Sequence, residues 1–197
     1  MSELLDRNRS VLVVIDLQGR LMDLVAHPAR LLAAGTRLLR LAEMCRVPVL
    51  LTEQYPKGIG PTHPEIRAAF DALTAPKRTM DKTTFDCVAD PKFAALLDEL
   101  RPKTDGPPRQ VVVAGAEAHV CVMQTVIQLL RTGDQVHLVW DAVSGRGAEY
   151  VRQALARMAQ AGAVITNHES VGFEWMRDKN HPRFREMSEL FKGGQPA

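Results

Sequence analysis

Short, continuous apolar runs recur along the chain, and their pattern predicts strands. The runs "SVLVVID" (10–16) and "QVVVAG" (110–115) have apolar interiors rich in β-branched residues. Such runs suit strands that are covered on both faces, as in a parallel sheet. Further strand-like segments are found at 48–53, 76–80, 135–143 and 163–166.

Between these runs, apolar positions recur at helical spacing. The segment 28–47 carries one apolar stripe, made of Leu31, Leu38, Ala42 and Cys45. A stripe of this kind is typical of a helix that packs one face on a core. Further helices are predicted at 62–73, 90–100, 121–133, 147–162 and 181–194, the last of which is amphipathic and ends in glycines.

Capping signals predict where several of these helices begin and end. Thr62 and Glu65 stand at capping-box spacing, which predicts a helix start at 62. Asp90 is suited to cap the next helix, with Pro91 at its first position. Gly133 closes the helix predicted over 121–133.

The order of the elements predicts the fold class. Strands that alternate with helices indicate an α/β protein with a parallel sheet. Right-handed crossovers then give a three-layer α/β/α sandwich with a doubly wound, mostly parallel six-stranded sheet. In such sheets ligands bind at the carboxyl ends of the strands, which here are marked by Asp16, Glu53 and the turn 115–121.

Composition narrows the class of protein. The chain has 197 residues, of which 46% are hydrophobic and 24% charged, which suits one domain over 1–197. A net charge of +2 favours neither nucleic acid nor an acidic membrane as a partner. The first apolar run is too short for a signal segment or a membrane span, so we expect a cytoplasmic protein.

The cysteines and histidines predict neither disulfides nor a metal site. Three cysteines, at 45, 87 and 121, without a secretory signal argue against a disulfide framework. Spaced metal motifs are missing, and so are the glycine-rich motifs of nucleotide-binding loops. Cys45 lies on an apolar helical stripe, and Cys87 has no evident partner, so both are interpreted as packing residues.

Three residues could form a site at the sheet edge. Asp16 could serve chemistry, although a lone aspartate more often caps a turn. Cys121 begins a helix whose N-terminal partial charge would stabilise a thiolate, but a free cysteine is also a common buried apolar residue. Lys82 follows a strand-like stretch, where an isolated lysine is usually solvated.

The chain carries three separated motifs in this order: "VVIDLQ" (13–18), "KTTFD" (82–86) and "VVVAGAEAHVCVMQT" (111–125). In this the chain resembles the isochorismatase-like cysteine hydrolase superfamily. The resemblance continues through "DAVSGRG", "ALARMAQAGAVIT" and the closing segment 169–192, so it covers nearly the whole chain. The closing segment and "TEQYPKGIG" are most similar to the subgroup of isochorismatase domain-containing proteins.

The resemblance implies a catalytic triad of Asp16, Lys82 and Cys121. Asp16 would take the thiol proton, Lys82 would hold the pair in register and favour the thiolate, and Cys121 would attack the substrate. The resemblance also implies a non-proline cis peptide bond between Ala116 and Glu117. That bond would turn the Glu117 N–H toward the Cys121 N–H, and the two would form an oxyanion hole.

The chain also departs from part of the family. Nicotinamidases of the superfamily bind a metal through a D-x-H motif after the second strand. Here that region reads "LLTEQYPKGIGPTHPE" (50–65), with Glu53 and Gln54 where the motif would begin, and His63 alone does not restore it. The sequence therefore predicts no nicotinamidase activity, no catalytic metal and no other cofactor.

Several side chains are candidates for contact with a small-molecule substrate. Glu53, Gln54 and Tyr55 follow the second strand, and Phe85 follows Lys82. His119, two residues before Cys121, could line the pocket, contact a neighbouring subunit or be a satisfied core residue.

The two tryptophans and the C-terminal region bear on assembly. Trp140 and Trp175 suit a core, an interface or a pocket equally well. The family resemblance and the segment 167–180 favour a homo-oligomer.

The favoured function is hydrolysis of a small amide or ureide through a thioester on Cys121. Two alternatives stay open. One is an isochorismatase-type ether hydrolase in which Asp16 acts as acid and base without the cysteine. The other is a non-catalytic interaction protein that has kept the fold, although such a protein has no need of Asp16, Lys82 and Cys121 together.

Overall fold

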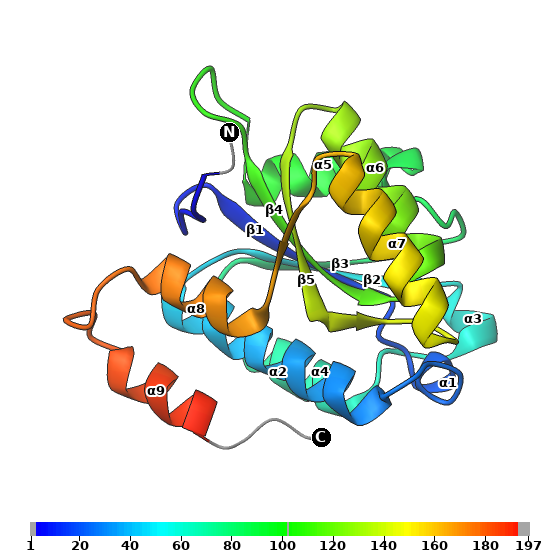
Figure 1. The fold of residues 1–197 in the computed structure, drawn as a ribbon, viewed down its shortest axis with the longest axis horizontal. Helices are drawn as coiled ribbons and strands as arrows, with labels where there is room; N and C mark the ends of the chain where they lie inside the picture. Colours follow the sequence, from blue (N-terminus) through cyan, green and yellow to red (C-terminus); the bar gives the residue numbers. More distant parts are fainter. Residues whose placement is uncertain (1–2, 102, 193–197) are drawn as a thin grey trace.

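The computed structural model describes residues 3–101 and 103–192. Its six strands form one parallel sheet in the order β3-β2-β1-β4-β5-β6. This confirms the predicted fold class, a three-layer sandwich with helices on both faces of the sheet (Figure 1). The strands are β1 (Ser10–Ile15), β2 (Val49–Gln54), β3 (Lys77–Lys82), β4 (Gln110–Ala116), β5 (Gln135–Ser144) and β6 (Val164–Thr166).

The strand order reverses beside β1, and this positions the site. β1 pairs with β2 on one side and with β4 on the other, so the chain winds outward in both directions from the centre. In doubly wound sheets the loops at the carboxyl ends of the two central strands diverge at such a point, and ligands commonly bind there. Asp16 follows β1 directly, and Cys121 follows β4 after a short turn.

Helices cover both faces of the sheet. The helices are α1 (Gly19–Met22), α2 (Pro28–Cys45), α3 (Pro56–Ile59), α4 (Pro64–Asp71), η1 (Cys87–Ala89), α5 (Pro91–Leu100), η2 (Ala118–Val122), α6 (Met123–Arg131), α7 (Ala148–Gln160), α8 (His168–Met176) and α9 (Phe184–Lys192). In Figure 1, α2, α4, α8 and α9 lie on one side of the sheet and α5, α6 and α7 on the other. Within residues 3–101 and 103–192, no helix combines the length and apolar character that a membrane span requires.

The core forms two layers, one on each face of the sheet. β1 is buried throughout, with Leu12 and Val14 in one layer and Val13 in the other. This two-sided burial explains why the strand is a continuous apolar run rather than an alternating one. Trp175 of α8 is 1% exposed and belongs to the α2 layer, so it is a core residue.

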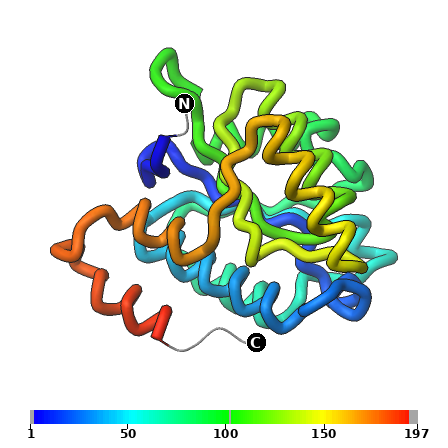
Figure 2. Tube along the Cα trace, in the orientation of Figure 1, coloured from blue at the N-terminus to red at the C-terminus, as the bar shows by residue number. Residues whose placement is uncertain are grey.

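The last part of the chain folds back along α2. Figure 2 shows α8 and α9, in orange and red, beside the blue and cyan of α2, and both helices contact it. A Cβ on Gly172 of α8 would come within 2.9 Å of the Leu41 side chain, which shows how close the two helices lie. The predicted terminal helix begins at Phe184 and not at 181, and the glycines expected to end it lie outside the described residues.

Three local predictions need correction. α4 is capped by His63, whose ring accepts from the Glu65 N–H at 3.4 Å, and not by a capping box at Thr62. Thr62 instead donates to the Glu53 carboxylate. Lys82, expected to follow the strand-like stretch 76–80, is the last residue of β3, and α8 lies where no helix was predicted.

Candidate active site

Asp16 sits at the centre of a buried polar cluster. Its backbone has a left-handed φ of 53°, which redirects the chain as it leaves β1. Its fully buried carboxylate accepts two hydrogen bonds at 2.7 Å, from the Thr52 hydroxyl on Oδ1 and from the Lys82 ammonium on Oδ2. A carboxylate in such a place needs charged or hydrogen-bonding partners, and Asp16 has both.

Lys82 reaches this cluster from the end of β3, two strands away. Its side chain is fully buried, and Nζ also donates to Gln54 Oε1 at 2.6 Å. Burial lowers the pKa of Lys82, but the negative charge of Asp16, helped by the nearby thiols, outweighs it and raises the pKa above the usual value. The ammonium is therefore charged at neutral pH.

Cys121 lies beside the same two residues, but the expected thiolate is not its resting form. The side chain is buried, and the residue is 6% exposed. The pKa of its thiol is raised to about 12, mainly by burial and then by the charge of Asp16, while Lys82 offsets this only in part. We expected the helix terminus and Lys82 to favour the thiolate; desolvation and Asp16 outweigh them.

The turn before Cys121 has an unusual backbone. The peptide bond that joins Ala116 to Glu117 is cis. The predicted helix over 121–133 begins earlier, as a π-helical turn over Ala118–Val122, in which the Val122 N–H donates to Glu117 O at 3.3 Å. π turns of this kind are frequent at functional sites.

The side chain of Glu117 is held from outside the turn. Arg146, in the loop between β5 and α7, donates to both carboxylate oxygens at 2.6 and 3.2 Å. Two parallel hydrogen bonds fix the orientation of a carboxylate more firmly than one does. The Arg146–Glu117 pair thus ties the turn that precedes Cys121 to the loop that follows β5.

The substrate-contact candidates divide between several places. Gln54 joins the cluster through Lys82, and its Nε2 donates to Thr83 O at 2.8 Å. Glu53 does not join it, because adjacent strand residues point to opposite faces and its carboxylate accepts from Thr62 and Arg67. Sequence reasoning had placed it beside Gln54.

The aromatic candidates lie nearer the surface. Tyr55 and Phe85 are 53% and 55% exposed, so neither ring is part of the core. His119 stacks on the Tyr150 ring of α7, with 5.0 Å between the ring centroids. Its Nδ1 is buried and has no hydrogen-bond partner among the described residues.

Sequence reasoning missed two members of the cluster. Thr52 is the residue before Glu53 and was hidden inside an apolar run. Cys87 was interpreted as packing, and it does belong to the core, but its thiol also lies close enough to Lys82 and Asp16 to feel their charges. Thr52 has no local sequence signal, because Asp16 is 36 positions away, and the Asp16 and Thr125 neighbours of Cys87 are likewise distant along the chain.

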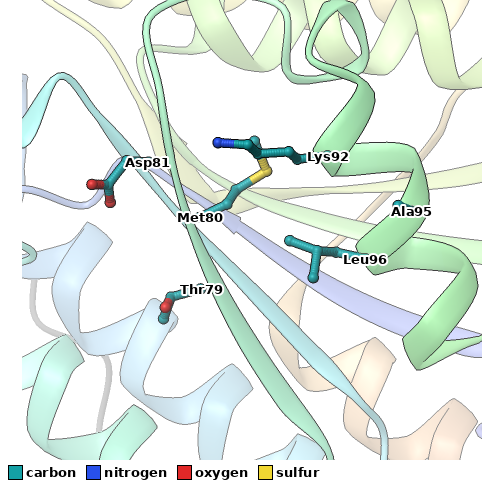
Figure 3. Close-up of a pocket in the computed structure, with 6 residues that line it drawn as sticks. All are labelled: Thr79, Met80, Asp81, Lys92, Ala95 and Leu96. Carbon is teal, nitrogen blue, oxygen red and sulfur yellow. The ribbon is translucent and has the colours of Figure 1, made fainter.

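Two surface pockets lie along the edge strand β3. One, of about 370 Å³, is lined by Lys82 together with Tyr55, Pro56, Lys57, Asp81, Thr83, Asp90 and Lys92. The larger one, of about 470 Å³, lies between β3 and α5 and contains none of the cluster residues (Figure 3). Over residues 3–101 and 103–192, no three His, Cys, Asp or Glu side chains gather in a way that could hold a metal ion.

Comparison with known proteins places this geometry in a family. The model of the isochorismatase domain matches residues 10–170. The chain belongs to the isochorismatase family. Members of this family have a hydrolase fold, and the strands that carry Asp16, Lys82 and the approach to Cys121 all lie inside the matched region.

Relatives of the isochorismatase family extend the match over most of the chain. Isochorismatase domain-containing protein 2 of Pongo abelii is 38% identical over 187 residues, which are 95% of this chain and 85% of that protein. The structure of MAR1 ribonuclease from Caenorhabditis elegans superimposes with a TM-score of 0.88 at 32% identity, covering 99% of this chain and 95% of the other. The YcaC gene product from Escherichia coli, an octameric hydrolase of unknown specificity, has a TM-score of 0.80 at 24% identity, covers 98% of each chain and supports the fold alone.

Proposed function

We propose that the protein is a cysteine hydrolase of a small amide- or ureide-type substrate. One observation carries the proposal: three separate strands deliver Asp16, Lys82 and Cys121 to one buried cluster. Packing alone does not require an acid, a base and a thiol in contact. Perturbed titratable groups that gather at the carboxyl edge of a parallel sheet are typical of catalytic sites.

The first half of the proposed reaction forms a thioester. Asp16 takes the proton of Cys121 as the sulfur attacks the substrate carbonyl carbon, and the C=O electron pair moves onto oxygen. The backbone N–H groups of Glu117 and Cys121 hold this oxyanion, at about 3 kcal/mol for each donor. The oxyanion then collapses, the C–N bond breaks, and the leaving nitrogen takes the proton from Asp16.

The second half releases the acid product. Water attacks the thioester carbonyl, Asp16 takes a proton from that water, and the C–S bond breaks. The sulfur recovers a proton from Asp16, which returns the site to its starting state. Lys82 keeps the carboxylate in place throughout and compensates its charge.

The raised pKa of Cys121 gives this scheme a specific requirement. With a thiol pKa of about 12, only a minute fraction of the protein carries a thiolate at neutral pH. Deprotonation must therefore accompany attack on the carbonyl, and a base in contact with the thiol is needed. Asp16 is the carboxylate that lies beside it.

The test is a screen of amides and ureides with the wild-type protein and Cys121→Ala. We expect hydrolysis by the wild type and a loss of at least about 1,000-fold in the variant. Cys45→Ala is the matched control, because Cys45 is also a buried cysteine but lies on α2, away from the cluster. The Cys45→Ala variant should keep the turnover of the wild type.

Other outcomes would favour the alternatives. Cleavage of a vinyl ether that survives Cys121→Ala but not Asp16→Asn would indicate acid–base chemistry without the cysteine. RNA belongs in the screen because one similar structure is named a ribonuclease. No turnover of any substrate, together with no covalent adduct at Cys121, would favour an interaction protein.

A further inference from the structure

Thr52 is the second hydrogen-bond donor to Asp16, and its role is not explained by packing. Its hydroxyl lies 2.7 Å from Asp16 Oδ1, and both residues are fully buried. Lys82 occupies the other carboxylate oxygen, Oδ2, at the same distance. The two donors together therefore determine how the carboxylate plane is rotated.

The pairing of β1 with β2 places Thr52 at this position. Ile15 and Thr52 are partners in the parallel register, so the residue after Ile15 lies beside the Thr52 side chain. The Asp16 N–H also donates to Thr52 O at 3.2 Å. Thr52 thus holds both the backbone and the side chain of Asp16 just where the backbone takes its left-handed turn.

The direction of the hydrogen bond follows from the chemistry of the two groups. An ionised carboxylate only accepts, so Thr52 donates its single hydroxyl hydrogen to Asp16. The Cys87 side chain lies within hydrogen-bond reach of the Thr52 hydroxyl. The Cys87 N–H in turn donates to the Thr125 hydroxyl oxygen at 3.0 Å, which ties η1 to α6 beside the cluster.

We infer that Thr52 is a positioning residue that aims the Asp16 carboxylate at the Cys121 thiol. This inference rests on the proposed function, in which Asp16 is the base. The titratable groups that face Asp16 are Lys82 from β3, Cys121 from η2 and Cys87 from η1.

Two substitutions separate the hydroxyl from the shape of the side chain. Thr52→Val keeps the branched shape and removes the donor, and Thr52→Ser keeps the donor. We expect kcat of the valine variant to fall roughly 10- to 100-fold, the range of one hydrogen bond to a charged group, with KM nearly unchanged. The serine variant should recover most of the activity.

Thr36→Val is the matched control. Thr36 lies on α2, and its hydroxyl oxygen is buried with no hydrogen-bond partner among the described residues. Its replacement should leave kcat and the pH profile unchanged. If Thr52→Val melts below the assay temperature by circular dichroism, Thr52→Ala at a lower temperature gives the same comparison.

Alkylation tests the inference without any substrate. Iodoacetamide adducts at Cys121, mapped by mass spectrometry between pH 5 and 9, should form more slowly in Thr52→Val than in the wild type and in Thr52→Ser. Equal rates in a folded Thr52→Val and in the wild type would overturn the positioning role. Turnover that survives Cys121→Ala would instead overturn the proposed function. In that event, loss of this turnover in Thr52→Val but not in Thr52→Ser still supports the positioning of Asp16.

Discussion

At the scale of single residues, surroundings decide what each cysteine can do. The pKa values of Cys45, Cys87 and Cys121 are all raised, and burial is the largest cause in each case. Among the described residues, the charges that act on the Cys45 thiol are those of Arg7 and Arg183 and not of a carboxylate, and Cys87 is fully buried. Cys121 is slightly exposed and lies beside Asp16 and Lys82, so it is the nucleophile of the proposed reaction.

Asp16→Asn tests the base directly. The amide cannot accept the thiol proton, so we expect kcat on a Cys121-dependent substrate to fall about 100- to 10,000-fold. Alkylation of Cys121 should slow as well. Asp105→Asn is the control and should behave as the wild type, because Asp105 is exposed in the loop before β4, at the edge of the sheet opposite the site. An unchanged alkylation rate in Asp16→Asn would remove Asp16 as the base.

His137 gives the protein a pH-dependent stability. It is 1% exposed on β5, and neither ring nitrogen has a partner among the described residues. Burial, with a smaller contribution from Arg9, lowers its pKa to about 4. Between pH 6.5 and 4 the unfolded chain therefore binds a proton that the folded one does not, so stability is present above pH 6.5 and falls as the pH is lowered.

Urea titrations measure this effect. The free energy of unfolding should fall by up to about 3 kcal/mol between pH 6.5 and pH 4 on account of His137. His137→Val removes the titrating group and should flatten this part of the profile. His63→Asn, which changes a partly exposed histidine and keeps a capping side chain, should leave the slope in place. Equal slopes in the wild type and His137→Val would contradict the assignment.

At the scale of elements, β4 lies so close to β1 that no side chain fits at position 115. Its φ is 141°, and a Cβ there would lie 2.1 Å from the carbonyl oxygen of Ile15. That carbonyl precedes Asp16, so any displacement would move the proposed base. The close contact of the two central strands and the geometry of the site therefore depend on the same glycine.

Gly115→Ala should both destabilise the fold and impair the site. Backbone strain and overpacking together predict a loss of about 4 kcal/mol in the free energy of unfolding. Gly19→Ala is the control, because a Cβ at Gly19 meets nothing within 4 Å. Its melting temperature should match that of the wild type. Equal melting temperatures for Gly115→Ala and the wild type would contradict the clash.

At the scale of the whole molecule, several exposed apolar side chains bear on assembly. Trp140 of β5 is 42% exposed with the Arg30 guanidinium 5.9 Å from its ring, and Phe173 of α8 is 47% exposed. β6 is a short edge strand with Ile165 partly exposed. Large exposed apolar groups often mark protein interfaces, so these side chains favour a homo-oligomer. The homo-oligomer stays a prediction.

Light scattering on a sizing column tests this prediction. The mass should be at least twice that of the 21.8 kDa chain, and a whole multiple of it, at micromolar concentration. Trp140→Glu should lower the mass if that ring lies at the interface, because burying an unpaired carboxylate is costly. Exposed Glu149→Lys on α7 is a charge-change control. A single 21.8 kDa species for the wild type would contradict the oligomer.

The sequence alone determined the fold class and the main residues of the proposed triad. Apolar runs such as 10–16 and 110–115 encode strands buried on both faces, because burial on both faces requires a continuous apolar run. The motifs around Asp16, Lys82 and Cys121 indicated the family that the comparison shows. These features are local, since each is carried by a few consecutive residues.

The tertiary structure alone decided the hydrogen-bond partners of these residues and the pKa shifts of Lys82 and Cys121. Thr52 meets Asp16 across 36 positions of chain, and Glu53, its neighbour, turns away to Thr62 and Arg67. The raised pKa of Cys121 likewise depends on burial and on charges from distant strands. No local period encodes such contacts, because they exist only once β1, β2 and β3 lie side by side.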